Sequence, residues 1–236
     1  KQNYGIELGL LEKLEIQADY FRENRKNILQ SRSSIPTTMG LQASPQSNIG
    51  ESFGSGIDIS VDYSESFNKD LWASVRGNFT YATSEFRVYE EPDYAKAPWR
   101  SHIGQSLGQQ WGLIAERLFV DDEDVKNSPV QQYGEYKAGD IKYKDINQDG
   151  IIDDQDKVPI GYPTTPEIIY GFGFSLGYKN FDLSAFFQGS ARSSFWIDTK
   201  NLSPFADTDG DGNVVSQNAL LDKIAKSHWS EDNRDS

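Results

Sequence analysis

The sequence predicts an all-β fold: an antiparallel up-and-down meander that forms part of a large transmembrane β-barrel with long external loops. Three observations predict it. Apolar residues recur at every second position over several stretches, short polar turns join these stretches into pairs, and long connections separate the pairs. Because successive side chains of a strand point to opposite faces, each stretch has one apolar face and one polar or glycine face.

The alternation occurs in three successive pairs of stretches, at residues 4–10 with 14–20, 57–63 with 71–81, and 168–178 with 181–187. Several of these stretches reach the roughly ten residues that a tilted strand needs to cross a membrane. The turns within the pairs are short and polar, as hairpins require: Glu12-Lys13, Asn68-Lys69-Asp70 and Lys179-Asn180.

The connections between the pairs are long, and we place them at about residues 30–53, 90–109 and 120–165. Short turns at one end and long loops at the other are typical of an outer-membrane barrel. Aromatic residues also gather near the strand ends, as an interfacial girdle would: Phe67, Trp72, Tyr178 and Phe181 near the turns, and Tyr20, Phe21, Phe79 and Tyr81 at the far ends. The alternative is a soluble β-sandwich with one wet face per sheet.

Composition excludes several function classes. The 236 residues include 23 Lys and Arg against 36 Asp and Glu, a formal charge of −13, which argues against nucleic acid as a partner. The absence of Cys excludes disulfides and thiolate chemistry, and the two His residues have no companion motif. Apolar runs are too short for a membrane-spanning helix. Because the chain opens at Lys1 directly in strand-like alternation, we expect a piece of a longer protein; a mature protein after signal removal is the alternative.

One segment, residues 145–156, has the spacing of a calcium-binding loop. Oxygen-bearing side chains occupy its positions 1, 3, 5, 9 and 12, and Gly150 occupies position 6, where a sharp turn is needed. We predict that calcium binds to side chains of this loop and to one backbone carbonyl, that of Ile151; the full set is Asp145, Asn147, Asp149, Ile151, Asp153 and Asp156. The closing ligand is Asp, not Glu, which favours a structural site over a sensor. The alternative is a solvated acidic turn.

A second acidic, glycine-rich loop at residues 207–213 begins in the same way but has no closing acid. Its possible metal ligands are Asp207, Asp209, Asp211 and Asn213, and a polar loop without metal is the alternative. After it, residues 217–226 carry apolar side chains at helical spacing, which predicts a short helix.

Several motifs, taken in chain order, resemble the C-terminal half of SusC/RagA-type TonB-dependent outer-membrane transporters. The resemblance rests on residues 14–29 with Asp19-Tyr20-Phe21, 104–108 with Trp111-Gly112 and Leu118-Phe119, 139–163, 166–189, and His228-Trp229 through Asn233. It covers nearly the whole chain.

The resemblance implies the fold and the partners of that family. Its full-length members are 22-stranded barrels with an N-terminal plug that couples to TonB, and they import oligosaccharides or peptides together with a SusD-like surface lipoprotein. By this resemblance residues 1–236 are a partial C-terminal barrel segment without the plug, and the protein belongs in the outer membrane of a Gram-negative, Bacteroidetes-type bacterium, in contact with its lipid. The expected cofactor from the loop spacing is structural Ca²⁺.

Three functions compete on this evidence. The first is a wall and external-loop segment of such an importer, without catalysis. The second is a soluble, calcium-stabilised β-domain that binds carbohydrate through Trp99, Trp111 and Trp196. The third is a glycoside hydrolase that uses acids from Glu90-Glu91 or residues 121–124. Nothing in the sequence places two of these carboxylates at the separation that glycoside hydrolysis requires. We expect the first function and no enzyme activity.

Overall fold

The chain folds into two compact units in the computed structural model, which describes every residue except 198–204, 209–213, 219–220, 223–225, 227 and 235–236. The sheet unit comprises Lys1–Gln110 and Gly161–Ser194, and the loop unit comprises Trp111–Ile160 and Phe195–Ser236. Among the described residues, no helix is long and apolar enough to cross a membrane.

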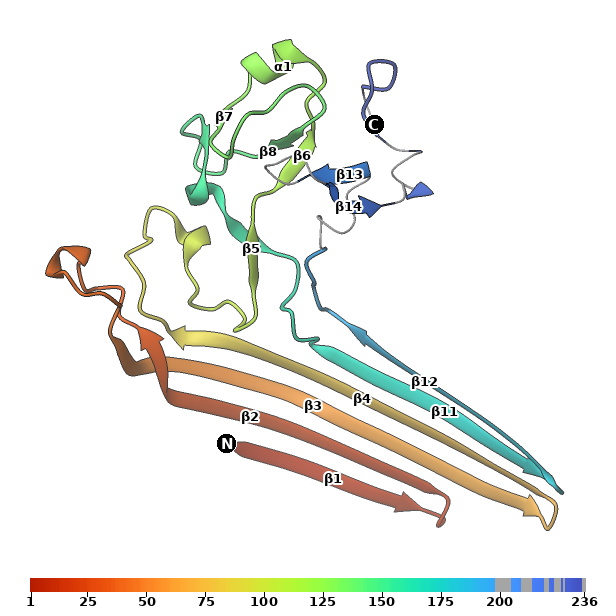
Figure 1. The fold of residues 1–236 in the computed structure, drawn as a ribbon. Helices are drawn as coiled ribbons and strands as arrows, with labels where there is room; N and C mark the ends of the chain where they lie inside the picture. Colours follow the sequence, from red (N-terminus) through yellow and green to blue (C-terminus); the bar gives the residue numbers. More distant parts are fainter. Residues whose placement is uncertain (198–204, 209–213, 219–220, 223–225, 227, 235–236) are drawn as a thin grey trace. The chain divides into compact units, whose positions relative to one another are not determined.

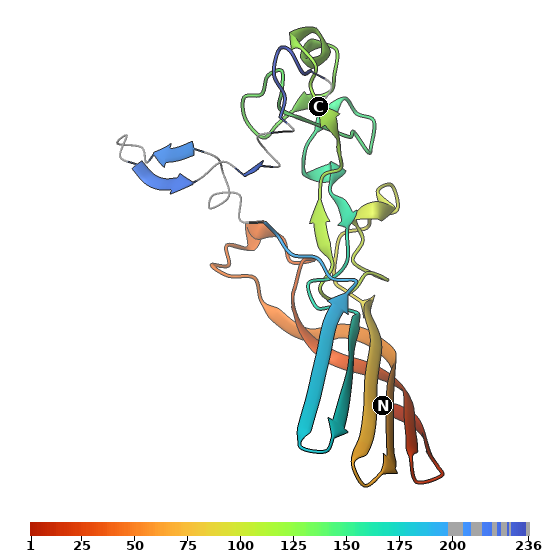
Figure 2. The ribbon, with the colours of Figure 1, turned by 90° about the vertical axis from the view of Figure 1, so that its right-hand side faces the viewer.

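The sheet unit is a single six-stranded antiparallel sheet in the order β1-β2-β3-β4-β11-β12 (Figure 1). Its strands are β1 (Gln2–Leu10), β2 (Leu14–Ser31), β3 (Gln46–Asn68), β4 (Leu71–Val88), β11 (Ile168–Tyr178) and β12 (Phe181–Ala191). The three short turns lie together at one end of the sheet (Figure 2). The predicted meander is therefore confirmed, and the predicted turns join the predicted strands.

Backbone conformation explains why the short turns form at these positions. Leu11, Glu12 and Lys179 all have positive φ angles of 54–56°, which suit the tight turns whose twist matches paired strands. At the turn between β3 and β4, the Asn68 side chain accepts a hydrogen bond from the Asp70 amide at 2.9 Å. Such a bond fixes an Asn in a turn locally.

The first long connection is shorter than predicted. Pairing between β2 and β3 continues to Ser31 opposite Gln46, so the connection covers residues 32–45 instead of 30–53. The sequence there is polar and rich in glycine and serine, which hides the alternation, but backbone hydrogen bonds hold the two strands together regardless of side chain. β2 and β3 thus extend well past the roughly ten residues of a membrane crossing.

The other two predicted connections are one excursion between β4 and β11. Its strands pair with one another and not with the main sheet: β5 (Gln110–Gly112) with β10 (Val158–Ile160), β6 (Ala115–Leu118) with β8 (Ile141–Tyr143), and β7 (Val130–Gln131) with β9 (Ile151–Ile152). The remaining elements are α1 (Asp122–Lys126) and the single-turn helices η1 (Thr37–Met39), η2 (Pro98–Arg100) and η3 (Asp154–Asp156).

Near the C-terminus the structure differs from the sequence prediction. β13 (Phe205–Thr208) pairs with β14 (Val214–Asn218), so Gln217 and Asn218 are in a strand and not in the predicted helix. Asp222 and Lys226 have helical backbone and form an ion pair at 2.6 Å. The rest of the predicted helix lies largely outside the described residues.

The two units differ in how they bury apolar side chains. Within the described chain, the large buried apolar side chains are Phe119, Ile152 and Val158, and all three belong to the loop unit. In the sheet unit no second sheet covers the apolar face in the part of the chain that the structure describes. Apolar side chains there remain open, for example Ile6 at 63 % exposed and Leu183 at 60 %. A sandwich would bury such side chains between two layers, so the sandwich alternative is wrong.

Candidate functional site

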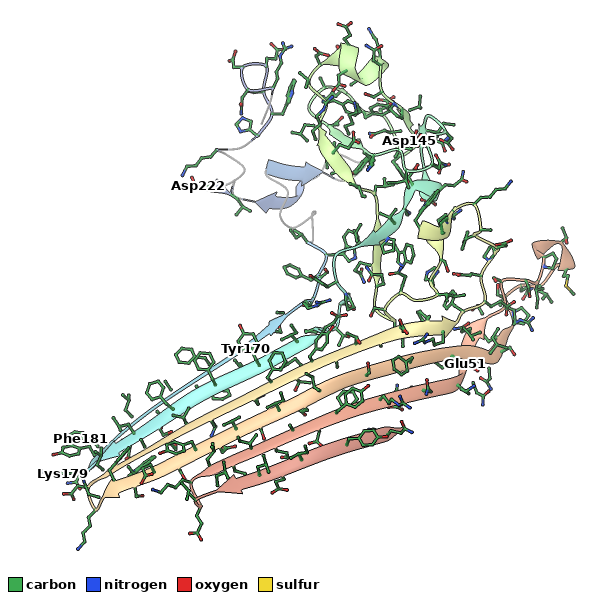
Figure 3. The ribbon with its side chains drawn as sticks, turned by 180° about the vertical axis from the view of Figure 1, so that it is seen from behind. Glu51, Asp145, Tyr170, Lys179, Phe181 and Asp222 are labelled. Atoms are coloured by element: carbon green, nitrogen blue, oxygen red, sulfur yellow. The ribbon has the colours of Figure 1, made fainter. Side chains whose placement is uncertain are left out.

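The strand register aligns the apolar positions of all six strands on one face of the sheet. One row runs across four strands as Ile59, Phe79, Tyr170 and Gly189, and another runs as Leu8, Ile16, Val61, Gly77, Phe172 and Phe187. Because neighbours in a row lie on the same side of the sheet, the apolar face is continuous from β1 to β12. The side chains shown in Figure 3 include Phe181 and Tyr170 on this face.

The opposite face is polar and carries rows of hydroxyl, charged and glycine residues. Ser64, Ser74, Ser175 and Ser184 form one such row, in which the Ser184 hydroxyl donates to Ser175 at 3.0 Å. Asp62 and Arg76 face each other in the next row at 3.7 Å. The segregation of apolar and polar residues predicted from the alternation is thus confirmed.

Three aromatic residues lie on the polar face, over glycines of the neighbouring strands. A Cβ added to Gly177 would lie 2.0 Å from the Trp72 indole, one added to Gly56 would lie 2.6 Å from Phe21, and one added to Gly173 would lie 2.7 Å from Phe186. Aromatic rings commonly cover strand glycines in this way. Trp72 and Phe21 therefore fill gaps on the polar face and do not belong to the predicted girdle of the apolar face.

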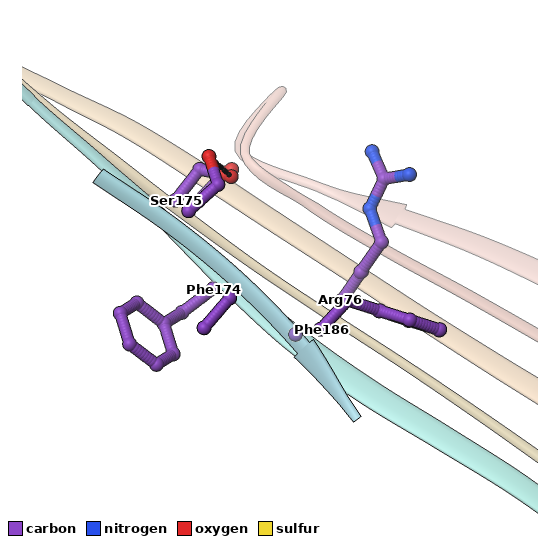
Figure 4. A pocket seen from close by; sticks show the side chains of 8 residues that line it. Arg76, Phe174, Ser175 and Phe186 are labelled. Carbon is purple, nitrogen blue, oxygen red and sulfur yellow. Dashed lines mark hydrogen bonds between the residues drawn. The ribbon is translucent and has the colours of Figure 1, made fainter. Parts of the chain in front are cut away.

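A shallow pocket of 530 Å³ lies near the middle of β11 and β12, lined by Ser74, Arg76, Ser175, Ser184 and Phe186 among others. Figure 4 shows Phe174 projecting from one side of the ribbon and Ser175 and Arg76 from the other. The close-up therefore shows the two chemically distinct faces of one strand. Phe186 lies on the polar face although it is aromatic, because its neighbour Phe187 lies on the apolar face.

In the loop unit, the predicted calcium loop folds as a tight turn held by its own acidic side chains. Asp145 accepts hydrogen bonds from the amides of Gln148 at 2.6 Å and Gly150 at 2.8 Å. Asp149 accepts from the Ile151 amide at 2.8 Å. Gly150 and Gln148 have φ angles of +83° and +60°, which explains the glycine at loop position 6.

Asp156 closes this loop from inside. It is fully buried, and its Oδ1 accepts from the Ile146 amide at 2.8 Å while its Oδ2 accepts from the Asp153 amide at 3.0 Å. The Asp153 side chain in turn caps η3 by accepting from Gln155 at 2.7 Å. The predicted ligands are thus brought into one loop, and Asp156 holds its two ends together.

No group of three or more His, Cys, Asp and Glu side chains within the described residues is placed to hold a metal ion. The predicted set at residues 145–156 also uses the amide oxygen of Asn147 and the carbonyl of Ile151, which such a group does not contain. Of the second acidic loop, Asp207 falls in β13, whereas Asp209, Asp211 and Asn213 lie outside the described residues.

A cluster around Asp124 holds α1 against the β6–β8 pair. Arg117 donates to both carboxylate oxygens, at 2.5 and 2.8 Å, and the Lys142 ammonium lies at 3.2 Å. The Arg117 guanidinium, together with the Val120 amide and Lys142, holds the pKa of the Asp124 carboxyl well below its usual range despite partial burial. The sequence showed only an acidic run here, because the basic partners are distant in sequence.

Most of the other residues considered for carbohydrate binding or catalysis are partly buried or form hydrogen bonds and ion pairs. Trp196 is 65 % exposed, whereas Trp99 and Trp111 are half-buried. Glu90 pairs with Arg32 at 2.6 Å, and Glu91 accepts from the His102 amide at 2.9 Å. These carboxylates fix the loops that follow β2 and β4.

Comparisons with known proteins agree with this geometry. No family model matches the chain. TonB-dependent receptor P3 of Formosa agariphila is 26 % identical over 200 residues, which is 79 % of this chain and 19 % of that receptor. TonB-dependent receptor P26 of the same organism is 50 % identical over 88 residues, or 37 % of this chain and 9 % of that receptor.

Solved structures of RagAB share the fold across the chain. The RagAB peptide transporter has a TM-score of 0.68 at 18 % identity, covering 99 % of this chain and 24 % of its own. The importer in its closed-closed state has a TM-score of 0.61 at 19 % identity, covering 99 % of this chain and 25 % of its own. The chain is therefore similar in sequence to TonB-dependent receptors and similar in fold to part of RagAB. It spans about a fifth of the first curated relative and about a quarter of the RagAB chains, and its antiparallel sheet matches a fragment of a TonB-dependent barrel in fold.

Proposed function

We propose that this chain is a barrel-wall and external-loop segment of a TonB-dependent importer in the outer membrane of a Gram-negative, Bacteroidetes-type bacterium. The observation that carries the proposal is the six-stranded sheet with an uncovered apolar face and a polar opposite face. In a membrane, acyl chains cover the apolar face, whereas in water such a large exposed apolar face would promote aggregation. The polar face then lines the lumen, and no step requires a catalytic residue.

The cargo and partners belong to the same proposal. We infer that the complete importer takes up oligosaccharides or peptides, works with a SusD-like surface lipoprotein and receives energy from TonB. The likeness to RagAB, which is described as a peptide importer, supports this inference. The soluble carbohydrate-binding alternative is disfavoured because two of its three Trp residues, Trp99 and Trp111, are half-buried.

Uptake by cells tests the importer proposal. A strain without the receptor is complemented with the complete gene, with or without an intact TonB, and given labelled oligosaccharides and oligopeptides. We expect TonB-dependent uptake of one class, and co-purification of a surface lipoprotein. Equal uptake with and without TonB, or cleavage of a glycan by the purified receptor alone, would contradict the proposal.

We further propose that the loop at residues 145–156 binds structural Ca²⁺. The spacing of its oxygen ligands and the positive φ angles at Gln148 and Gly150 support the proposal. Asp145, Asn147 and Asp149 would supply side-chain oxygens, Ile151 its carbonyl, and Asp153 and Asp156 the remaining carboxylates. A bound divalent cation would offset the repulsion among these acids. The second loop, with Asp207, Asp209, Asp211 and Asn213, remains a weaker candidate for the same ion.

Limited proteolysis with and without a chelator tests the calcium proposal. Ca²⁺ should slow cleavage between residues 145 and 156, and Asp149→Ala should abolish this protection. The matched control is Asp154→Ala, which removes one negative charge from the same loop outside the predicted ligand set; the Asp154 side chain is 73 % exposed. Identical cleavage with calcium and with chelator would contradict a calcium site.

A further inference from the structure

A pocket of 400 Å³ opens in the sheet unit, beyond the last rows of the apolar face and away from the short turns. We call it the rim pocket; its lining includes Phe53, Thr83, Glu85, Ser106, Tyr162 and Arg192. Phe53 faces Glu85 in the β3–β4 register and continues the alternation of Ile57 and Tyr81. Side chains two residues apart on a strand share a face, so Phe53, Thr83 and Glu85 lie on the apolar-face side.

Arg192 lines the rim pocket, Arg87 pairs with two residues of the lining, and each arginine has an acidic and an aromatic partner. Arg192 pairs with Glu167 at 2.7 Å, and its guanidinium lies 4.9 Å from the ring centre of Tyr162 and 5.7 Å from that of Tyr81. Contact with Tyr81 places Arg192 and Tyr162 on the apolar-face side. Arg87 repeats the arrangement: it pairs with Glu85 at 2.5 Å and lies 5.1 Å from the ring centre of Phe53.

The backbone conformation at Arg192 is further evidence that the fold itself positions this side chain in the pocket. Arg192 follows β12 directly and has a φ of +54°, a conformation that costs energy in any residue with a Cβ. The neighbouring turn is fixed by a hydrogen bond from the Tyr162 amide to Ser194 at 2.8 Å, and a Cβ on Gly161 would lie only 2.5 Å from the same hydroxyl.

The chemistry of the rim pocket fits a sugar ring. Both carboxylates of the lining are already paired, Glu167 with Arg192 and Glu85 with Arg87 outside the lining, which disfavours a simple ion as the ligand. The aromatic rings offer faces on which the C–H bonds of a sugar can pack, and the Tyr162 side chain is 44 % exposed. The hydroxyls of Thr83 and Ser106 and the carboxylate of Glu85 can pair with sugar hydroxyls.

Because the pocket adjoins the apolar face, we expect the bound sugar to be attached to a lipid. Beside it the apolar face begins with the row of Ile57, Tyr81 and Ile168, and the following row holds Phe79 and Tyr170. We propose that the rim pocket binds the sugar headgroup of a membrane glycolipid whose acyl chains lie against Phe79 and Tyr170. This inference rests on the proposed embedding of the apolar face in the outer membrane.

Native mass spectrometry of the complete receptor tests whether the rim pocket binds a glycolipid, and n-dodecyl-β-maltoside serves as the glycolipid probe. A polyoxyethylene detergent with the same dodecyl chain controls for apolar adsorption, and maltose controls for free sugar. We expect the receptor to retain one dodecyl maltoside that the other detergent does not replace at equal concentration. Tyr162→Ala should weaken that binding about tenfold, a loss typical of one ring contact. Tyr162→Phe should preserve it, and so should Phe181→Ala, at the other end of the apolar face.

Three outcomes overturn the inference. Equal retention of both detergents would show adsorption without headgroup recognition. Unchanged binding in Tyr162→Ala would show that the rim pocket is not the site. Competition by maltose at the same concentration as dodecyl maltoside would show a site for free sugar and not for a glycolipid. A receptor that binds no detergent of either kind would instead contradict the proposed membrane function.

Discussion

At the scale of single residues, two carboxylates organise the loop unit: Asp124, which is partly buried, and Asp156, which is fully buried. Asp124 pairs with the cationic side chains of Arg117 and Lys142. Asp156 accepts hydrogen bonds from backbone amides. The sequence could locate Asp156, because the loop spacing requires an acid at that position. It could not locate the Asp124 cluster, because Arg117 and Lys142 are joined to it only by the fold.

Because of the Asp124 cluster, we expect acid to lower the stability of the loop unit. Asp124→Asn should destabilise the unit by about 1–3 kcal/mol at pH 7, the value of hydrogen bonds to a charged group. Because the folded-state pKa of Asp124 is lowered, its contribution is complete above the unfolded pKa of about 3.9 and is lost as the pH falls through the folded value. Hydrogen exchange of the β6 and β8 amides between pH 7 and pH 2 measures this.

The control for this experiment is Asp122→Asn, on the same short helix and exposed, which should leave exchange unchanged. The difference in exchange rate between the wild type and Asp124→Asn should become smaller below about pH 4. A difference that stays constant into strong acid would show that charge at Asp124 does not stabilise the unit.

We expect the loop at residues 145–156 to open when the Asp156 carboxylate is removed, whether or not calcium is present. Asp156→Ala leaves the amides of Ile146 and Asp153 without their acceptor inside the protein, at a cost of about 1–3 kcal/mol for each unsatisfied group. Proteolysis of the loop in excess calcium should therefore be faster than in the wild type. Cleavage at the wild-type rate would show that Asp156 does not close the loop.

At the scale of elements, paired strands depend on glycines that make room for aromatic rings. Gly9 and Gly173 stand in the same polar-face row, connected through Glu15, Asp62 and Arg76. A Cβ on Gly173 would lie 2.7 Å from Phe186 and 2.9 Å from the Ala185 carbonyl, whereas a Cβ on Gly9 meets nothing within 4 Å.

This contrast predicts opposite results from one substitution. Gly173→Ala should lower the thermal unfolding midpoint of the complete receptor, because Phe186 and the backbone of β12 must move. Gly9→Ala should leave it unchanged or raise it slightly, because alanine reduces the freedom of the unfolded chain. Gel-shift unfolding over a temperature series measures both, and equal midpoints would contradict the role of Gly173.

Strand prediction succeeded where alternation was strong and failed where it was weak. All three hairpins follow from apolar residues at every second position and from polar turns. The extension of β3 back to Gln46 was missed because this polar, glycine-containing segment shows no alternation and pairs with β2 through the backbone. The predicted aromatic girdle was wrong for Trp72 and Phe21, because proximity to a strand end does not fix which face a side chain occupies.

At the scale of the molecule, the proposed function requires lipid on the apolar side of the sheet and water on its polar side. Phe174 and Ser175 are neighbours on β11 that face opposite sides. An arginine on the lipid side costs about 2–4 kcal/mol near the bilayer midplane. Phe174→Arg should therefore reduce folding of the receptor into lipid bilayers, whereas Ser175→Arg should reduce it little. Equal folding yields of the two variants would contradict the assignment of faces.

The most direct test labels both faces of β11 and β12. The chain has no Cys, so single cysteines can be placed at Phe174, Leu183 and Phe187 on the apolar face and at Ser175, Ser184 and Gln188 on the polar face. In the complete receptor in bilayers, fluorophores at the first three should be quenched by brominated lipid, and those at the other three should not. Equal quenching at both sets, or none at the first, would contradict a sheet that separates lipid from a hydrated lumen.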